Sequence, residues 1–248
     1  MMDKGFDIAR FKDIVKSVLK NKQVRYTDFL SLSEQKLFEK ATLKEQYQGI
    51  QYYFEGGYPS AERKIAIIYP DFLKPEETPI CAIRAVGNLS KLSHRDVLGS
   101  LLGLGIKRQK IGDIIVKEDK CDVLLHRDVQ AYVLMSLLKI GKEKVNVTSI
   151  ELKDVMEPEI KCKDVFSTVA SLRVDSVVAV GFGISRTKAS EFIKSGMAQI
   201  NWEYIEDPSS EVKEGDVVSL RGFGRIKLEE VKGVTKKGRF SVHILRFM

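Results

Sequence analysis

Cysteine and long apolar runs are scarce in this sequence. The 248 residues include only three cysteines, Cys81, Cys121 and Cys162, with about 40 residues between neighbours. An odd number at that spacing suits neither a disulfide framework nor a zinc site. The first residues, Met1–Phe6, hold no apolar stretch that suits a signal peptide. The longest apolar run, Ala131–Leu138, falls well short of the ~20 residues of a membrane-spanning helix. We therefore expect a soluble, reduced, cytoplasmic protein with no membrane partner.

Signatures of catalysis are missing as well. Two His-Arg-Asp runs, at 94–96 and 126–128, are accompanied by none of the other protein-kinase motifs. The run Gly181-Phe182-Gly183 lacks the third glycine of a dinucleotide-binding fingerprint, because Arg186 stands at that position. The histidines do not have the spacing of metal ligands. We expect no enzyme activity, no cofactor and no metal.

Positive charge is concentrated at the end of the chain. The sequence has 41 Lys and Arg against 34 Asp and Glu, a net charge of +7. Residues 221–248 hold eight of the basic side chains and two of the acidic ones, which accounts for +6 of that total. A basic segment of this kind favours a polyanionic partner, most simply nucleic acid.

The first part of the chain, residues 1–75, is predicted to be a helical and hairpin subdomain. Apolar residues recur at helical spacing from Phe6 to Leu19 and again after Ser33, which resembles a helix cap. Strands are predicted at Ile50–Phe54 and Lys64–Tyr69, around a Gly56-Gly57 turn. An aromatic cluster is interpreted as core of this subdomain rather than as a base-stacking surface: Tyr47, Tyr52, Tyr53, Phe54 and Tyr58.

The middle part, residues 76–160, has the order of an RRM-like (ferredoxin-like) domain. Its pattern predicts β-α-β-β-α-β, with elements at Ile80–Val86, Ser93–Gly105, Ile111–Lys117, Asp122–His126, Asp128–Ile140 and Val145–Leu152. The two strands expected at the centre of the sheet carry no aromatic residue, and RRM domains stack bases on aromatics there. A scaffolding or protein-binding role is therefore favoured over RNA binding for this part. The polar stretch Glu157–Asp164 is interpreted as a linker.

The last part, residues 165–248, contains a helix start of unusual charge. After an extended segment at Phe166–Leu172 we expect a helix at Val174–Val180, a turn at Gly181–Gly183, and a second helix from the cap Ser185 to Lys194. The first turn of that second helix holds cations and no acid, which opposes the helix dipole by a few tenths of a kcal/mol. The same arrangement suits a phosphate. An ordinary solvated helix start is the alternative.

The order of motifs here resembles the S4-type RNA-binding domain. The resemblance is carried by Arg173-Val174-Asp175, Gly183–Ala189, Phe192–Gly196, Gln199–Asn201 and Val212–Val218. Trp202 is a departure from the pattern, because that domain commonly has glycine at this position, and it puts a standard tight turn at 201–202 in question. Short β segments are predicted from Met197 to Phe247, to complete an α+β domain.

The resemblance implies an RNA-binding surface around the second helix. Ser185–Lys188 would contact the RNA backbone, Arg173 would partly brace the first helix, and basic strand residues would flank the groove. The predicted RNA-binding residues are Arg173, Ser185, Arg186, Thr187, Lys188, Lys194, Asn201, Arg221, Arg225 and Lys227.

The whole architecture, an α+β chain of three parts, resembles the bacterial YlmH family. The run from His94 to Ile114 is similar to the signature of the middle domain in that family. Membership implies ribosome-linked RNA binding without catalysis, in association with large-subunit complexes that hold peptidyl-tRNA after stalled translation. The expected partners are structured RNA (ribosomal RNA, tRNA or both), the large ribosomal subunit, and cell-division or quality-control proteins. Two alternatives stay open: a cell-division adaptor with secondary RNA binding, and an accessory of an RNA-modifying enzyme.

Overall fold

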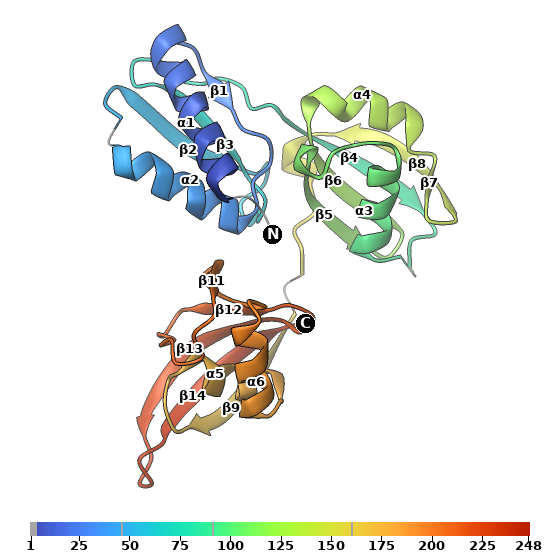
Figure 1. Cartoon of the computed structure of the whole chain (residues 1–248). Helices are drawn as coiled ribbons and strands as arrows, with labels where there is room; N and C mark the ends of the chain where they lie inside the picture. Colours follow the sequence, from blue (N-terminus) through green and yellow to red (C-terminus); the bar gives the residue numbers. More distant parts are fainter. Residues whose placement is uncertain (1–3, 46, 91, 160) are drawn as a thin grey trace. The chain divides into compact units, whose positions relative to one another are not determined.

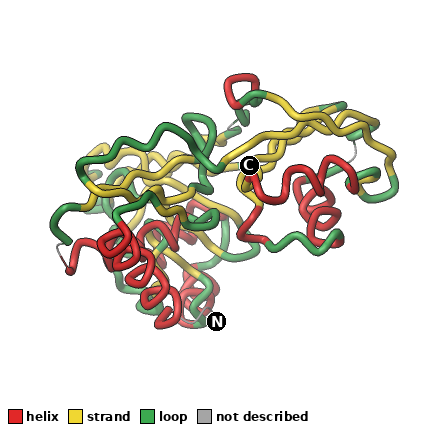
Figure 2. Tube along the Cα trace, turned by 90° about the horizontal axis from the view of Figure 1, so that it is seen from above, coloured by secondary structure: helices red, strands yellow, loops and turns green. Residues whose placement is uncertain are grey.

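The structure is a computed structural model that describes residues 4–45, 47–90, 92–159 and 161–248. The described chain mixes helices and strands joined by loops and turns, which Figure 2 distinguishes by colour. It has an α+β fold, as predicted, and the described strands form three sheets. The contacts divide the chain into two compact units, Met1–Pro158 and Glu159–Met248. The first unit contains both an N-terminal and a middle part.

The N-terminal part packs two helices against a three-stranded sheet (Figure 1). Its helices are α1 (Lys4–Asn21) and α2 (Leu32–Glu45), and its sheet has the order β1 (Arg25–Tyr26), β3 (Ile65–Pro70), β2 (Ile50–Glu55). The two-residue strand β1 is too short to show a pattern in the sequence.

The predicted cap of α2 is two residues too late. Ser31, not Ser33, is the N-cap of the helix. Its backbone N donates to Glu34 Oε2 at 2.6 Å, and its Oγ accepts from Glu34 N at 3.4 Å. This is a capping box, in which serine and glutamate satisfy each other's backbone N–H groups. A box needs the acid three residues after the cap, which fixes Ser31 as the cap.

The aromatic cluster is mostly core, as predicted. The rings of Tyr52 and Phe54 meet Phe38 of α2 edge to face, with centroids 5.1 and 5.7 Å away. Tyr47 packs against the same core, and Tyr58 against the neighbouring cluster. Tyr53 is the exception, because it lies on the other side of β2 with 38% of its surface exposed.

The middle part has the predicted β-α-β-β-α-β order. Its elements are β4 (Ile80–Gly87), α3 (His94–Gly103), β5 (Ile111–Lys117), β6 (Lys120–His126), α4 (Arg127–Ser136) and β8 (Glu143–Ile150), and its sheet has the order β5-β6-β4-β8-β7. The helix expected to reach Ile140 ends at Ser136. Lys139–Ile140 instead form β7, which pairs with β8 across a turn at Gly141, where φ is 60°.

One face of the middle sheet is closed by the N-terminal part. Residues that face α3 and α4, such as Ile83 and Val123, form one cluster with those helices. On the opposite face, Ala82 and Leu124 are direct cross-strand partners and fully buried. They share a second cluster with a group of N-terminal side chains, Phe29, Ile65 and Ile67. The centre of the face on which RRM domains stack bases is therefore occupied by protein.

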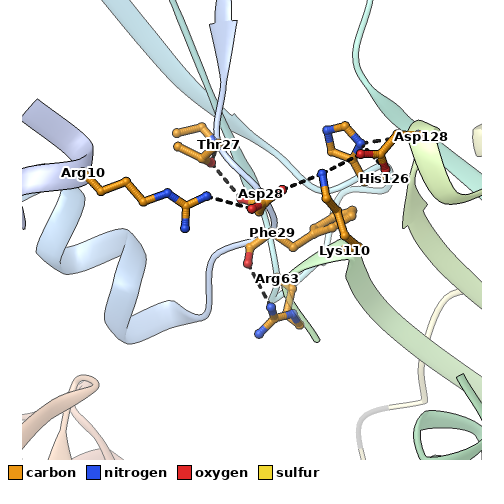
Figure 3. Close-up of polar contacts among 9 residues, drawn as sticks. Arg10, Thr27, Asp28, Phe29, Arg63, Lys110, His126 and Asp128 are labelled. Carbon is orange, nitrogen blue, oxygen red and sulfur yellow. Dashed lines mark hydrogen bonds and ion pairs between the residues drawn. The ribbon is translucent and has the colours of Figure 1, made fainter. Parts of the chain in front are cut away.

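Charged side chains join the two parts at this junction (Figure 3). The Lys110 ammonium lies 2.8 Å from Asp28 Oδ1 and 2.6 Å from Asp128 Oδ2, and Arg10 lies 2.8 Å from Asp28 Oδ2. Burial acts to raise the pKa of Asp28, but hydrogen bonds from Lys110 and Arg10 outweigh it and lower that pKa.

Asp113 makes a second polar link between the parts. Its carboxylate accepts hydrogen bonds from the Tyr58 hydroxyl at 2.8 Å and from the backbone N of Glu62 and Arg63 at 2.7 and 3.0 Å. The Arg63 guanidinium in turn donates to the Phe29 carbonyl at 2.9 Å (Figure 3). It also donates to the Ile111 carbonyl at 2.9 Å. Together with the buried apolar cluster, these bonds make the two parts one unit.

The second unit is a six-stranded antiparallel sheet with two helices on one face (Figure 1). Its elements are β9 (Cys162–Val169), α5 (Val174–Phe182), α6 (Arg186–Lys194), β10 (Ala198–Ile200), β11 (Glu203–Ile205), β12 (Val217–Leu220), β13 (Gly224–Val234) and β14 (Phe240–Phe247), and the sheet has the order β11-β10-β12-β13-β14-β9. The β13–β14 hairpin projects beyond the helices (Figure 1).

Two boundaries in this unit differ from those predicted. Cys162–Asp164, expected in a linker, belong to β9 because the strand pairs with β14 along its whole length. Gly181 and Phe182, expected in a turn, are the last residues of α5, and the turn begins at Gly183. Gly183 has a φ of 70°, the left-handed conformation that commonly ends a helix.

A tight turn forms at 201–202, although Trp202 stands where the S4-type domain commonly has glycine. Ile200 and Glu203 are direct partners of β10 and β11, so Asn201 and Trp202 alone make the connection. Both have positive φ, 47° and 67°, as a two-residue hairpin turn requires. The Asn201 amide holds the turn in place, because it donates to Asp216 Oδ1 at 2.7 Å and accepts from Val217 N at 3.0 Å.

Candidate nucleic-acid interface

The start of α6 has the predicted cap. Ser185 Oγ accepts a hydrogen bond from Lys188 N at 3.2 Å, and the first turn of the helix holds no acidic residue. A sharp connection leads into it from α5, where Ile184 N donates to Ala179 O at 2.9 Å. Ser185, Thr187 and Lys188 are exposed. The first turn therefore lies at an exposed end of the helix, where its N–H groups are close to a hydroxyl and a cation.

Asp175 joins the starts of α5 and α6. Its carboxylate accepts from Arg173 and from Arg186, each 3.1 Å from Oδ2, and also from Ser176 Oγ at 3.2 Å. The Asp175 side chain is 5% exposed, whereas those of Arg173 and Arg186 are 42% and 51% exposed. Burial acts to raise the pKa of Asp175, but the bonds from the two arginines outweigh it and lower that pKa.

This geometry forms a surface that can bind an anion. Each arginine uses part of its fork of N–H donors on Asp175, and the exposed remainder is available to a phosphate. Lys188 reaches over the Phe192 ring, with 5.8 Å from Nζ to the ring centroid. Five predicted residues therefore come together at the start of α6, and we call them the α6-start cluster: Arg173, Ser185, Arg186, Thr187 and Lys188.

The other predicted residues lie elsewhere in the unit. Lys194 is in the last turn of α6, roughly 13 Å along the helix from its start. Arg221 is close to that far end, since its backbone N donates to Met197 O at 3.0 Å. The Asn201 amide is engaged within the turn already described.

Arg225 and Lys227 lie on the side of the sheet opposite α6. They alternate along β13 with Ile226 and Leu228, which are buried in the cluster that includes α5 and α6. The Arg225 guanidinium is 5.5 Å from the Phe247 ring centroid, and Lys227 Nζ is 2.7 Å from Glu229 Oε2. The structure does not bring these two cations to the α6-start cluster.

The described residues hold neither a cluster of metal ligands nor a membrane-spanning helix. Among the residues that the structure describes, no three or more His, Cys, Asp or Glu gather as metal ligands would. None of the described helices is both long and apolar enough to cross a membrane.

Three family models match consecutive stretches of the chain. They are "YlmH, N-terminal" over residues 6–73, "Putative RNA-binding domain in YlmH" over 76–154, and "S4 domain" over 172–218. The third match includes the whole α6-start cluster.

Two known proteins are similar over much of their length. The "Ribosome-associated protein quality control protein P2" of Bacillus subtilis (strain 168) is 37% identical over 224 residues, which are 89% of this chain and 86% of that protein. The structure of "Cell division protein ylmH from Streptococcus pneumoniae" is 21% identical with a TM-score of 0.54, and the match covers 63% of this chain and 96% of that one. At that identity the likeness concerns the fold alone.

Proposed function

This chain belongs to the YlmH family, and on that premise we propose that it is a non-catalytic RNA-binding protein that acts on the large ribosomal subunit. Its RNA-binding role agrees with the S4 domain and with the ribosome-associated relative. We further propose that it binds tRNA on the large subunit, that it takes part in the rescue of stalled translation, and that it works in the cytoplasm. The B. subtilis relative, which is named for ribosome-associated protein quality control, supports these further roles.

The observation that carries the proposal is the α6-start cluster. Two half-exposed arginines, an exposed lysine and the N–H groups of the helix start surround one point of the second unit. Such a group suits the phosphates of structured RNA, which is recognised largely by backbone and shape. The charge placement opposes the helix dipole, so binding explains it better than helix stability does.

The first unit has a different role in this account. The centre of its RRM-like sheet face is buried against the N-terminal part, which leaves no room there for stacked bases. We propose that this unit is a scaffold that contacts protein, including quality-control or cell-division proteins. The division of this first unit into an N-terminal part, residues 1–75, and a middle part that begins at residue 76 is part of the same proposal.

Sedimentation with purified ribosomal subunits tests the proposed function. The full chain is mixed with small subunits, with empty large subunits, and with large subunits that carry peptidyl-tRNA. We expect it to pellet with large subunits, most completely with those that carry peptidyl-tRNA, and to stay in solution with small subunits. Equal pelleting with both subunits, or with neither, would contradict the assignment to the large subunit.

A further inference from the structure

A hollow lies at the end of α6 opposite to the α6-start cluster. It is lined by Gly196 and Met197 after the helix, by the β10 and β12 residues Gln199, Ser219 and Leu220, and by Tyr204 and Arg221. Its volume is about 280 Å³, just below the roughly 300–1,000 Å³ of small-molecule pockets.

The polar lining comes from the open face of the sheet. Gln199 is the direct partner of Tyr204 on one side and of Ser219 on the other, so the three side chains form a row across β11, β10 and β12. Their neighbours along the strands, such as Ala198 and Val218, are buried in the cluster that contains α5 and α6. The row therefore faces away from the helices.

The side chains of the row, an aromatic ring, an amide and a hydroxyl, are of the kinds that contact nucleotide bases. Tyr204 is 59% exposed, which is high for an aromatic ring on a sheet. A ring in this position is a stacking platform for a base, while the Gln199 amide and the Ser219 hydroxyl offer donors and acceptors to the edge of that base.

Arg221 is the one charged residue among those that line the hollow. Its backbone is anchored to Met197 O, and its guanidinium has no hydrogen bond or ion pair within the described part of the chain. The Glu206 carboxylate lies near Gly196, since Oε1 is 3.7 Å from where a Cβ on that glycine would be. A phosphate is therefore favoured at the Arg221 side and disfavoured at the Gly196 side.

We propose that this hollow binds one unpaired nucleotide of the RNA, with its base stacked on Tyr204 and its phosphate on Arg221. The inference rests on the proposed RNA-binding function and adds a preference to it. The α6-start cluster binds the backbone of a helical segment, and the hollow selects RNA in which a base next to that segment is free to leave the stack.

Fluorescence anisotropy with two short, labelled RNA duplexes tests the preference. One duplex carries a single bulged adenosine, and the other carries an abasic residue at the same place, so that only the base differs. The full chain should bind the bulged adenosine at least about fivefold more tightly, the lower limit for stacking on an aromatic side chain. Tyr204→Ala should lose that preference and Tyr204→Phe, which keeps the ring, should retain it. Tyr132→Ala removes an exposed tyrosine of the first unit and should also retain it.

A spectroscopic readout separates stacking from an indirect effect on folding. With 2-aminopurine as the bulged base, binding of the wild-type chain should quench the fluorescence through contact with Tyr204. Tyr204→Ala should bind without that quenching, and thermal unfolding of each variant checks that the second unit is folded.

The possible failures point to different conclusions. If the two duplexes bind equally and binding still depends on Arg186 and Lys188, the hollow does not bind an unpaired nucleotide. The proposed function would then still stand. Absence of binding to either duplex at low salt would overturn both. If adenosine monophosphate displaced the bulged duplex at an equal concentration, the hollow would be a site for free nucleotides and the RNA assignment would be wrong.

Discussion

Arg186, the first residue of α6, donates from Nε to Asp175 Oδ2, the buried carboxylate at the start of α5, over 3.1 Å. The same carboxylate also accepts from Arg173. A cation at a helix start, where the dipole disfavours it, is thus held by an anion of the preceding helix. The pair fixes the position of a guanidinium that remains half exposed, which is what a preformed phosphate site needs.

Replacing Asp175 by asparagine is expected to destabilise the second unit. The substitution preserves the shape but removes the charge that pairs with both arginines, and charge-assisted hydrogen bonds contribute more than neutral ones. We expect the free energy of unfolding to fall by about 1–2 kcal/mol. Urea unfolding of the variant beside Glu191→Gln, an exposed carboxylate on α6, measures the difference. An equal change in both variants would contradict a special role for Asp175.

Acid is expected to weaken both units through their aspartates. The pKa values of Asp28 and Asp175 lie below the ordinary 3.8 in the folded protein. Their contribution to stability is therefore complete above pH 3.8 and is lost as the pH falls through the lower, folded values. Unfolding measured from about pH 5 down to about pH 2.5 checks this. The double variant Asp28→Asn/Asp175→Asn should lose less stability over that interval than the wild type, and an unchanged slope would refute the prediction.

Asp113 is expected to be essential to the junction within the first unit. Asp113→Ala removes three hydrogen bonds from the N-terminal part, and the loss should be on the order of 2 kcal/mol in the unfolding of that unit. Asp119→Ala, at an exposed turn, is the matched control. RNA affinity should stay unchanged in both variants, because the proposed site lies in the second unit. A large loss of RNA binding in Asp113→Ala would show that the first unit takes part.

RNA affinity is expected to fall steeply with salt. If Arg173, Arg186, Lys188 and Lys194 each neutralise about one phosphate, the binding constant should drop on the order of 100-fold between 50 and 200 mM salt. Titrations of the full chain with a structured RNA at several salt concentrations measure the slope. Affinity that stayed level over this range would contradict a mainly electrostatic interface.

The elements that could be predicted from sequence are those with a repeating apolar pattern and a clear stop. The middle part is an example, with strands rich in Val and Ile and a helix ending near Gly105. Strands of two or three residues, such as β1 and β11, have no such pattern, because pairing with a neighbour creates them. The end of α4 at Ser136 could not be predicted for a similar reason. Apolar residues continue after Ser136, but there they belong to a strand that pairs with β8.

The candidate site likewise has one part that could be predicted from the sequence and one part that could not. Its local half, the cap and cations at the start of α6, follows from adjacent residues and was predicted. Contacts between residues far apart in the sequence were not predicted. The hollow at Tyr204 and Arg221 is an example, because it depends on the pairing of β10 with β11 and with β12. The alternation of Arg225 and Lys227 with buried residues was visible in the sequence. The sequence does not show that α5 and α6 cover the opposite face of the sheet. That arrangement separates these two cations from the α6-start cluster.

Sedimentation of variants with purified large subunits decides whether the α6-start cluster binds RNA. Arg186→Ala/Lys188→Ala removes two charges from the cluster, and Lys16→Ala/Lys20→Ala removes two from exposed positions of α1. We predict that the wild type and the α1 variant pellet with the large subunit, while the cluster variant stays in solution. Pelleting of the cluster variant to the same extent as the wild type would contradict the account.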